Sequence, residues 1–326
     1  MAVVSAPFET VLGQPTAVEL LQRAIACDRI APAYLFTGPA GIGRRQAAVA
    51  FAQHLLRPRR GSQAASAEIT RRRIHQRNHP DLLWIEPTYV HQGKLVAAAE
   101  AAELGLKRKS PPQIRLEQIR QLTRFLARPP LEASRSLVVI DPAETMAEGA
   151  ANGLLKTLEE PGQATLILLA PDGHSLLPTL VSRCQCVPFS RLDVATLATV
   201  LERSGYGEIL SQPEILAIAQ GSPGAAIAHW QQQQMIPAAL LQGLAEPPTS
   251  LRQALGQARD IAKTLDTESQ LWLVNYLQHR YWQQYQIQAE PWLRQLEQAR
   301  RQLLGYCQPR LVWEVALMAL VVGESL

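Results

Sequence analysis

The sequence is poor in cysteine, and its cysteines are spread too widely to build a metal centre. The 326 residues contain four, Cys27, Cys184, Cys186 and Cys307, and only one C-x-C pair lies close together. Because a zinc site needs a second such pair, no metal site is predicted, and a reducing cytoplasm is expected. Cys184 and Cys186 are predicted to take alternate positions on a strand, with one side chain buried.

Long apolar runs are missing as well. The longest uncharged apolar stretch, residues 315–322, falls far short of the roughly 20 residues that cross a bilayer. The opening residues carry no basic group ahead of an apolar run, as a secretory signal would. These features predict a cytoplasmic protein and argue against a membrane protein or an exported one.

Charge of one sign is not in large excess either. The formal net charge is +4, which by itself does not indicate a nucleic-acid binder. One basic stretch has no interleaved aromatic residues to stack on bases, so a solvated loop or helix face is predicted. Its arginines are Arg57, Arg59, Arg60, Arg71, Arg72, Arg73 and Arg77.

Short apolar runs alternate with helix-like segments in the first half of the chain, whereas the second half carries helical patterns only. Runs at residues 33–36, 82–85, 137–140 and 165–169 are typical of buried parallel strands. This order predicts an α/β domain followed by an α-helical part.

The second half also contains a break. Two prolines in Glu246-Pro247-Pro248-Thr249 stop a helix, and Thr249 or Ser250 can cap the next one. Beyond this break, apolar residues at helical spacing predict a bundle of amphipathic helices. They are Leu271, Val274, Leu277 and Tyr281, then Leu311, Val315, Met318 and Val322. Residues 88–113, by contrast, are predicted to form a flexible insertion.

A glycine-rich turn joins the first predicted strand to a helix. In a working phosphate loop, G-x-x-x-x-G-K-[ST], backbone N–H groups wrap the phosphates, the lysine reaches the outer phosphates and the hydroxyl holds Mg²⁺. Gly38 and Gly43 keep this spacing, with Gly41 between them, but Arg44 replaces the lysine and Arg45 the hydroxyl. At about 4 Å and an effective dielectric near 20, a guanidinium repels a dication by roughly 8 kcal/mol. Metal binding is therefore disfavoured.

Phosphate binding is left open, because Arg44 keeps a positive charge, although a planar guanidinium is not equivalent to an ammonium. The preferred interpretation is a turn that binds no nucleotide.

A second chemical position follows the strand predicted at residues 137–140. Asp141 ends this strand, and where a hydrolase continues with a glutamate that activates water, the chain has Pro142. Proline carries no base, so hydrolysis would lack one. Asp141 is either the remnant of a metal-binding carboxylate or a cap of the next helix. Glu144 is predicted to have an exposed polar role at a helix start.

Eight segments of the chain carry a family resemblance when they are taken in order. They are VLGQPTAVELLQRAI from Val11, AYLFTGPAGIGR from Ala33, HPDLLWIEP from His79, IRLEQIRQL from Ile114, LVVIDPAETM from Leu137, NGLLKTLEEP from Asn152, LLPTLVSRC from Leu176, and PRLVWEVALMAL near the end. This series resembles the ordered landmarks of AAA+ subunits of the bacterial DNA polymerase III clamp loader. The resemblance implies a RecA-like α/β domain with a parallel sheet at residues 1–189, a helical lid at 190–245, and an all-α collar for oligomerisation at 246–326.

Within that family the tau and gamma subunits hydrolyse ATP, whereas delta prime combines a degenerate phosphate loop with a Ser-Arg-Cys motif. This chain resembles delta prime. It has Ser182-Arg183-Cys184, it has Ala170-Pro171 in place of hydroxyls, and its GSPGAAI segment from Gly221 lacks the lid arginine. The resemblance implies that Arg183 is a trans arginine finger for ATP on an adjacent subunit. In isolation, an arginine at this place would neutralise helix-end carbonyls.

The resemblance also implies partners. A non-hydrolysing member of a ring with tau or gamma and delta would help to load the sliding clamp on primed DNA, while its partners bind the ATP. No cofactor of its own is expected, and no zinc, because residues 57–78 lack the cysteines of the family's zinc module. Two alternatives remain. One is an active ATPase of the tau or gamma type, against which Arg44, Arg45 and Pro142 argue, and the other is an AAA+-like adaptor outside replication.

Overall fold

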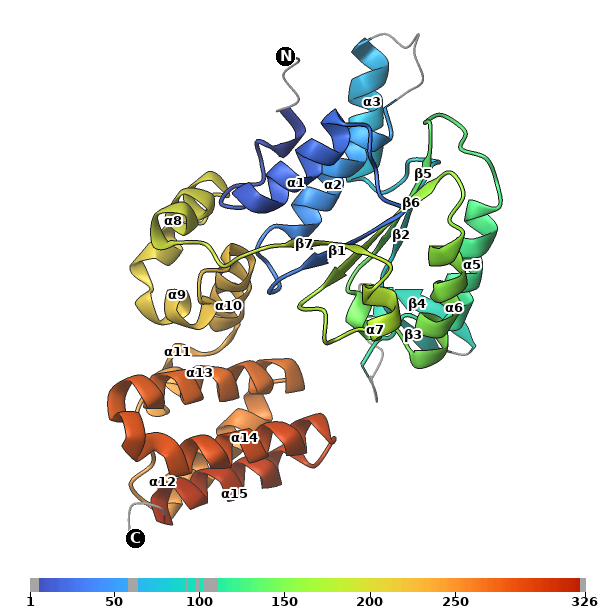
Figure 1. Ribbon diagram of the computed structural model, residues 1–326. Coiled ribbons are helices and arrows are strands. Elements are labelled where there is room, and N and C mark those ends of the chain that lie inside the picture. The colour runs from blue at the N-terminus through green and yellow to red at the C-terminus, as the bar shows by residue number, and fades with distance from the viewer. Residues whose placement is uncertain (1–5, 58–63, 92, 98–99, 102–110, 323–326) are drawn as a thin grey trace. The chain divides into compact units, whose positions relative to one another are not determined.

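The computed structural model (Figure 1) describes residues 6–57, 64–91, 93–97, 100–101 and 111–322. The chain divides into two compact units. Unit 1 comprises residues 1–200 and 221–224, and unit 2 comprises residues 201–220 and 225–326. The further division of the chain into three domains stays a prediction. Within the described ranges, no helix has the length and apolar character needed to span a membrane.

Unit 1 is built around a five-stranded parallel sheet with the order β2-β5-β6-β1-β7. The four strands predicted from apolar runs are confirmed, and each end differs from its prediction by at most one residue. The strands are β1 (Ala33–Thr37), β2 (Leu82–Ile85), β5 (Ser136–Ile140), β6 (Ala164–Ala170) and β7 (Gln185–Pro188).

Alternate residues along the central strands face two separate cores, which is why these strands are apolar throughout. Tyr34 and Phe36 of β1 pack on one side with Phe51, and Leu35 packs on the other with Leu154. Helices cover both faces of the sheet (Figure 1). The first face carries α1 (Pro15–Ala26), α2 (Arg44–Leu55) and α3 (Ala64–His75), and the second carries α5 (Leu116–Leu126), α6 (Glu148–Glu159) and α7 (Pro178–Val181).

The segment after β2 begins with a hairpin. Strands β3 (Thr88–His91) and β4 (Lys94–Ala97) pair in antiparallel fashion, and Thr88 and Gln113 exchange backbone hydrogen bonds of 3.0 and 3.1 Å. The prediction of a flexible insertion is wrong for this hairpin, because strand pairing satisfies its backbone groups. Residues 98–99 and 102–110 of the insertion lie outside the described residues.

The basic stretch is only partly the solvated face that was predicted. Arg71 and Arg72 are exposed on α3, but Arg73 pairs with Glu132 at 2.9 Å. Arg77 contacts a carboxylate and an aromatic ring near the sheet edge. Arg59 and Arg60 fall outside the described residues.

Unit 2 is helical. The predicted stop at two prolines separates α11 from α12, and Ser250 caps α12 by accepting the N–H of Gln253 at 3.3 Å. Val274, Leu277 and Tyr281 of α13 are buried, as their spacing predicts. The shorter helices are α8 (Val194–Arg203), which begins in unit 1, η3 (Gly207–Ser211), α9 (Pro213–Ala219), α10 (Pro223–Met235) and α11 (Ala238–Gly243). The later elements are the long helices α12 (Leu251–Thr264), α13 (Thr267–Tyr285), α14 (Glu290–Leu304) and α15 (Pro309–Val322), with the short η4 (Gln286–Ala289) between α13 and α14.

The last helix, α15, buries a face next to the one that its spacing predicted. Leu311 and Val315 are 57% and 45% exposed, and the buried side chains are Val312, Trp313, Ala316, Leu317 and Leu320. The prediction fails here because α15 is apolar on more than one face, so its periodicity does not identify the buried one. Helix α12, which packs against α15, likewise exposes Leu251 and Leu255. The two helices therefore present apolar side chains to solvent.

Candidate functional site

The glycine turn predicted as a degenerate phosphate loop connects β1 to α2. Gly41 and Gly43 have φ values of 79° and 106°, in the left-handed region that favours glycine. Gly43 directly precedes the first helical residue, Arg44. The strand, turn and helix expected of a phosphate loop are therefore present, and both arginines stand on the first turn of α2.

A loop from the predicted lid packs directly on this turn. The N–H of Gly224 donates to the carbonyl of Gly41 at 2.9 Å, and the Ser222 hydroxyl donates to the carbonyl of Ala40 at 2.7 Å. A Cβ on Gly224 would lie 2.6 Å from the Gly41 Cα, which leaves no room for a side chain. The segment predicted to lack a lid arginine thus covers the turn with its own backbone.

Arg45, which replaces the metal-binding hydroxyl, contacts residues that follow two neighbouring strands. Its Nε donates to Asp141 after β5, and its terminal N–H donates to Glu86 after β2 at 2.8 Å. The Asp141 side chain is only 7% exposed. Burial raises the pKa of its carboxyl, and the Arg45 guanidinium opposes that rise. Asp141 does not cap the following helix, η2 (Ala143–Thr145), because Arg45 binds its carboxylate instead.

Glu86 extends this ion pair into a chain. Its second carboxylate oxygen accepts a hydrogen bond from Arg77 at 2.7 Å, and the Arg77 guanidinium lies 4.5 Å from the centre of the Trp84 ring, a cation–π contact. Trp84 and Glu86 lie within the quoted segment HPDLLWIEP, but neither they nor Arg77 were predicted to be site residues. The signal that could have found Glu86 is its place directly after β2, because the carboxyl ends of parallel strands share one edge.

Arg44, which replaces the lysine, is less well satisfied. One of its terminal nitrogens is buried without a hydrogen-bond partner among the described residues. Burial lowers the pKa of its guanidinium, and Asp141 and Glu144 oppose that effect. Glu144 is exposed at the start of η2, as predicted, and partial burial of its carboxyl raises its pKa.

This site does not fit the Mg²⁺ ion that an AAA+ fold implies. Mg²⁺ requires oxygen ligands in nearly octahedral geometry, but here a guanidinium occupies the ligand position and binds the Asp141 carboxylate. Pro142, which follows Asp141, supplies no base. The position expected to bind a metal ion is therefore taken by a guanidinium, and the position directly after Asp141 carries no base.

We expect the replacement of Arg45 by alanine to lower the free energy of unfolding by about 1–3 kcal/mol, because it leaves a buried carboxylate without its partner. Adding Asp141→Asn should restore much of that loss, since a neutral amide is less costly to bury. Urea-unfolding midpoints of the wild type, both single variants and the double variant measure the coupling between the two residues. If the two single losses simply add in the double variant, the pair makes no net contribution to stability.

Arg183 belongs to a different part of unit 1, just after α7. Its guanidinium donates to the carbonyl of Thr179 at 3.0 Å and to the carboxylate of Glu159 at 2.7 Å. The first contact is the helix-end role expected of an isolated arginine. A guanidinium has five N–H donors, and these contacts to described residues leave donors for an acceptor outside the chain. The side chain is 37% exposed.

The neighbours of Arg183 are arranged differently from the sequence prediction. Ser182 is exposed and donates its hydroxyl to the Thr179 carbonyl at 3.1 Å. Cys184 is half-buried ahead of β7, and burial raises the pKa of its thiol to about 12. Cys186 is exposed on β7. The prediction that one of these two cysteines is buried holds only in part, because Cys184 is partly buried against the second core but precedes β7. Val187 is the buried residue of the strand itself.

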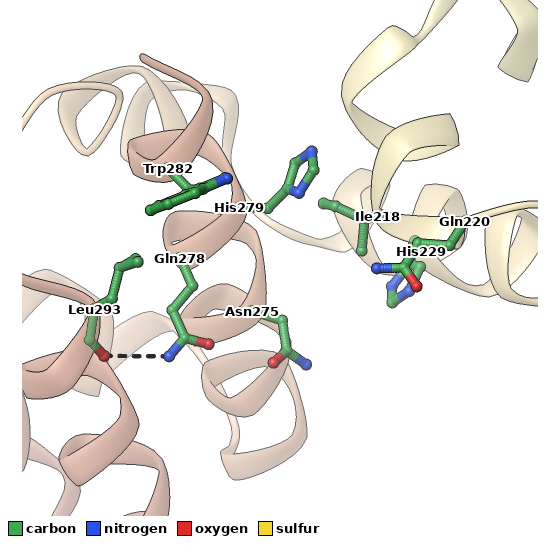
Figure 2. Close-up of a pocket in the computed structure, with 8 residues that line it drawn as sticks. All are labelled: Ile218, Gln220, His229, Asn275, Gln278, His279, Trp282 and Leu293. Atoms are coloured by element: carbon green, nitrogen blue, oxygen red, sulfur yellow. Dashed lines mark hydrogen bonds between the residues drawn. The ribbon is translucent and has the colours of Figure 1, made fainter. Parts of the chain in front are cut away.

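Unit 2 contains a cavity of about 470 Å³, lined from α13 by residues that include Trp282 and His279 and from the shorter helices by residues that include His229 (Figure 2). Burial lowers the pKa of both histidines, and His229 accepts a hydrogen bond from the Trp272 indole at 2.9 Å. Both imidazoles are therefore neutral at pH 7, and none of the cavity's lining residues carries a formal charge.

The sequence model of the family described as "DNA polymerase III, delta subunit" matches residues 13–193, which is more than half of the chain. The chain belongs to this family. A second model, described as the C-terminal domain of cyanobacterial DNA polymerase III delta prime, matches residues 195–320.

Curated relatives of the DNA polymerase III delta family agree with this assignment. The chain is 33% identical over 180 residues to DNA polymerase III subunit delta' of Bacillus subtilis, covering 55% of this chain and 48% of that protein. It is 36% identical over 199 residues to the delta' subunit of Pseudomonas aeruginosa, covering 59% and 54%. The chain thus spans about half the length of these relatives.

A solved structure supports the fold class. The DNA polymerase III gamma subunit-related protein of Thermotoga maritima superimposes with a TM-score of 0.55 at 18% identity, covering 94% of this chain and 99% of that one. This likeness concerns the fold alone. The predicted fold class, a parallel sheet with helices followed by a helical C-terminal region, is confirmed.

In this member of the DNA polymerase III delta family, the structure brings some of the predicted site residues together and separates others. Gly41, Gly43, Arg44, Arg45 and Asp141 gather at one edge of the sheet. Ser182-Arg183-Cys184 lies by the end of α6 and makes none of these contacts. Glu159 lies within the quoted segment NGLLKTLEEP, but the sequence did not identify it as the partner of Arg183, which stands 24 residues later.

Proposed function

We propose that this chain is a non-hydrolysing subunit, delta prime, of the DNA polymerase III clamp loader, and that it helps to load the sliding clamp on primed DNA in the cytoplasm. The observation that carries the proposal is the ion pair between Arg45 and Asp141. The place at which an active AAA+ subunit positions a metal ion is taken here by a cation of the chain itself. The chain then contributes to the ring through its surfaces and through Arg183.

Arg183 is proposed to act on ATP that is held by an adjacent tau or gamma subunit. A guanidinium that crosses an interface offsets the negative charge that develops on a transferring phosphoryl group. Its partial exposure and its contacts with Thr179 and Glu159 support this role, since they hold the side chain at the surface with donors to spare. Ser182 and Cys184 are its neighbours in the motif and have no proposed chemical role.

The helices from residue 246 onward are proposed to be the collar that joins the partner subunits, with residues 190–245 as the lid. The exposed apolar side chains of α12 and α15 support this assignment, because apolar surface that is not buried within one chain is typical of a contact with another. Tau or gamma and delta are the proposed neighbours. Contacts with the clamp and DNA are proposed to arise through the complex.

The alternative of an active ATPase is disfavoured by the geometry of Arg45 and by Pro142. An adaptor outside replication remains the other alternative. Reconstitution separates it from the main proposal: a ring of tau or gamma with delta should load the clamp on primed DNA only when this chain is added. Equal loading with and without the chain would favour the adaptor.

The isolated chain is expected to bind Mg-ATP no more tightly than the millimolar range and to release no phosphate, because Arg45 repels the metal and Pro142 supplies no base. Isothermal titration with Mg-ATP, beside an assay of phosphate release, measures both properties. Titration with ATP and EDTA is the control for binding without metal. Micromolar, Mg²⁺-dependent binding with turnover would instead identify an active ATPase.

A further inference from the structure

The charges around the first turn of α2 are balanced within unit 1. Three carboxylates stand near three guanidiniums, and the contacts alternate in sign from Asp141 to Arg45, to Glu86 and to Arg77. Arg44 completes the set, since it interacts electrostatically with Asp141 and Glu144. The carboxylates are Asp141, Glu86 and Glu144, and the guanidiniums are Arg44, Arg45 and Arg77. A divalent cation added here would leave a net excess of two positive charges.

Arg45 holds the position that a bridging cation would take. Asp141 follows β5 and Glu86 follows β2, and these two strands are paired in the sheet from Leu82 opposite Leu137 to Ile85 opposite Ile140. Their carboxylates therefore meet at one edge, where a hard divalent cation is the usual bridge between such groups. The Arg45 guanidinium donates to both carboxylates from the start of α2. One side chain thus ties the glycine turn to the ends of two strands.

We infer that Arg45 is a built-in substitute for the metal ion: its fixed charge holds the Asp141 and Glu86 carboxylates together and keeps divalent cations out. The inference deepens the non-hydrolysing part of the proposed function, and it rests on that proposal only in treating this edge as a former nucleotide site. Arg45, and not Arg44, is the residue that keeps divalent cations out. Arg44 has a buried nitrogen with no partner among the described residues, and it makes no hydrogen bond there with Asp141.

Removal of the Arg45 charge alone should therefore convert this edge into a cation site. The variants Arg45→Ser and Arg45→Gln both remove the charge, and glutamine keeps an amide that can donate to Asp141. Mn²⁺, followed by its electron paramagnetic resonance signal in the isolated full chain, is the probe. We expect both variants to bind Mn²⁺ at least tenfold more tightly than the wild type, and Arg45→Ser/Asp141→Asn to lose that gain. Arg44→Gln removes a neighbouring charge but leaves both carboxylates bound by Arg45, so it should gain clearly less affinity than the Arg45 variants.

Thermal unfolding supplies a second measurement. Mg²⁺ at about 10 mM should raise the unfolding temperature of the Arg45 variants and leave that of the wild type unchanged. An ion that binds only the native state stabilises that state. The inference is overturned if the folded variants bind Mn²⁺ no better than the wild type. It is also overturned if Arg44→Gln shows the same gain, or if both Arg45 variants stay unfolded even with Mg²⁺. Since the cation-binding experiment uses no partner subunit, its failure leaves the clamp-loading proposal standing. A failure of the clamp-loading experiment likewise leaves the inference about Arg45 standing.

Discussion

Replacement of Arg183 by alanine is expected to slow ATP hydrolysis at the one neighbouring site by about 10³-fold or more. Hydrolysis by the whole ring should fall by a smaller factor, because only one of its several ATP sites would lose a guanidinium. Arg183 is partly exposed, and among the described residues it donates to two acceptors, so folding and assembly should be unchanged. DNA-stimulated ATPase and clamp-loading rates of otherwise identical reconstituted rings measure the effect.

Two further variants sharpen this experiment. Arg183→Lys should recover little activity, since an ammonium cannot reproduce the planar donor pattern of a guanidinium. Arg294→Ala is the matched control, because Arg294 is another exposed arginine that pairs with a glutamate of its own chain, at 2.6 Å. If rings with Arg183→Ala load the clamp at the wild-type rate, Arg183 is only a helix-end residue bound to the Thr179 carbonyl.

Glutamates at both Leu311 and Val315 are expected to weaken assembly with the partner subunits by at least about 100-fold. Burial of one large aliphatic side chain contributes about 1.5–3 kcal/mol, and a carboxylate forced into an apolar contact adds a desolvation cost. Two such positions exceed the roughly 2.8 kcal/mol that corresponds to a 100-fold change in Kd. Both side chains are exposed in the chain alone, so its own stability should change little. Sedimentation of labelled chain with partner subunits measures the Kd.

The control for this surface is Ile287→Glu, which places the same charge on an isoleucine of unit 2 that is 77% exposed and lies outside α12 and α15. Full assembly by the double glutamate variant would contradict the proposed collar contact. Truncation after Ala245 is a less specific test. It would also remove Trp272 and Arg280, which bind His229 and Glu214 at 2.9 and 2.6 Å, and would expose the shorter helices of unit 2.

Local features of the structure were predictable from the sequence because their causes are local. The central strands follow from apolar runs short enough to exclude helices, and burial on both faces explains why these runs do not alternate. The glycine turn follows from residue spacing. The start of α12 follows from Ser250, whose side chain supplies an acceptor for a free N–H group.

The ion chain at the sheet edge could not be predicted, because it depends on topology. Arg45 and Asp141 are 96 residues apart, and they meet only because β1 and β5 are separated by β6 alone in the sheet. The pattern at Asp141 therefore left open both a capping role and the remnant of a metal site. The sequence shows that Arg45 replaces a metal-binding hydroxyl. That Arg45 binds two carboxylates could be predicted only with knowledge of the strand order.

Two other failures have physical causes within single segments. The composition of residues 88–113 suggested a flexible insertion, yet Gly93, with a φ of 75°, makes the turn of a hairpin there. A single glycine has little effect on the average composition of a long segment. For α15, apolar residues are too numerous to define one stripe. Periodicity identifies a buried face only when the other faces are polar.

The close approach of Gly41 and Gly224 affects how the retention of glycine at these positions in related sequences should be interpreted. No side chain fits at Gly224, and a Cβ on Gly38 would lie 2.5 Å from the Phe189 carbonyl oxygen. Glycine is therefore required at these positions by backbone packing, with or without a phosphate nearby. Descendants of this sequence should keep the glycine spacing of a phosphate loop, although selection on these glycines acts through the fold. Invariant glycines in such a loop are no evidence of ATP binding unless the residues after the last glycine agree.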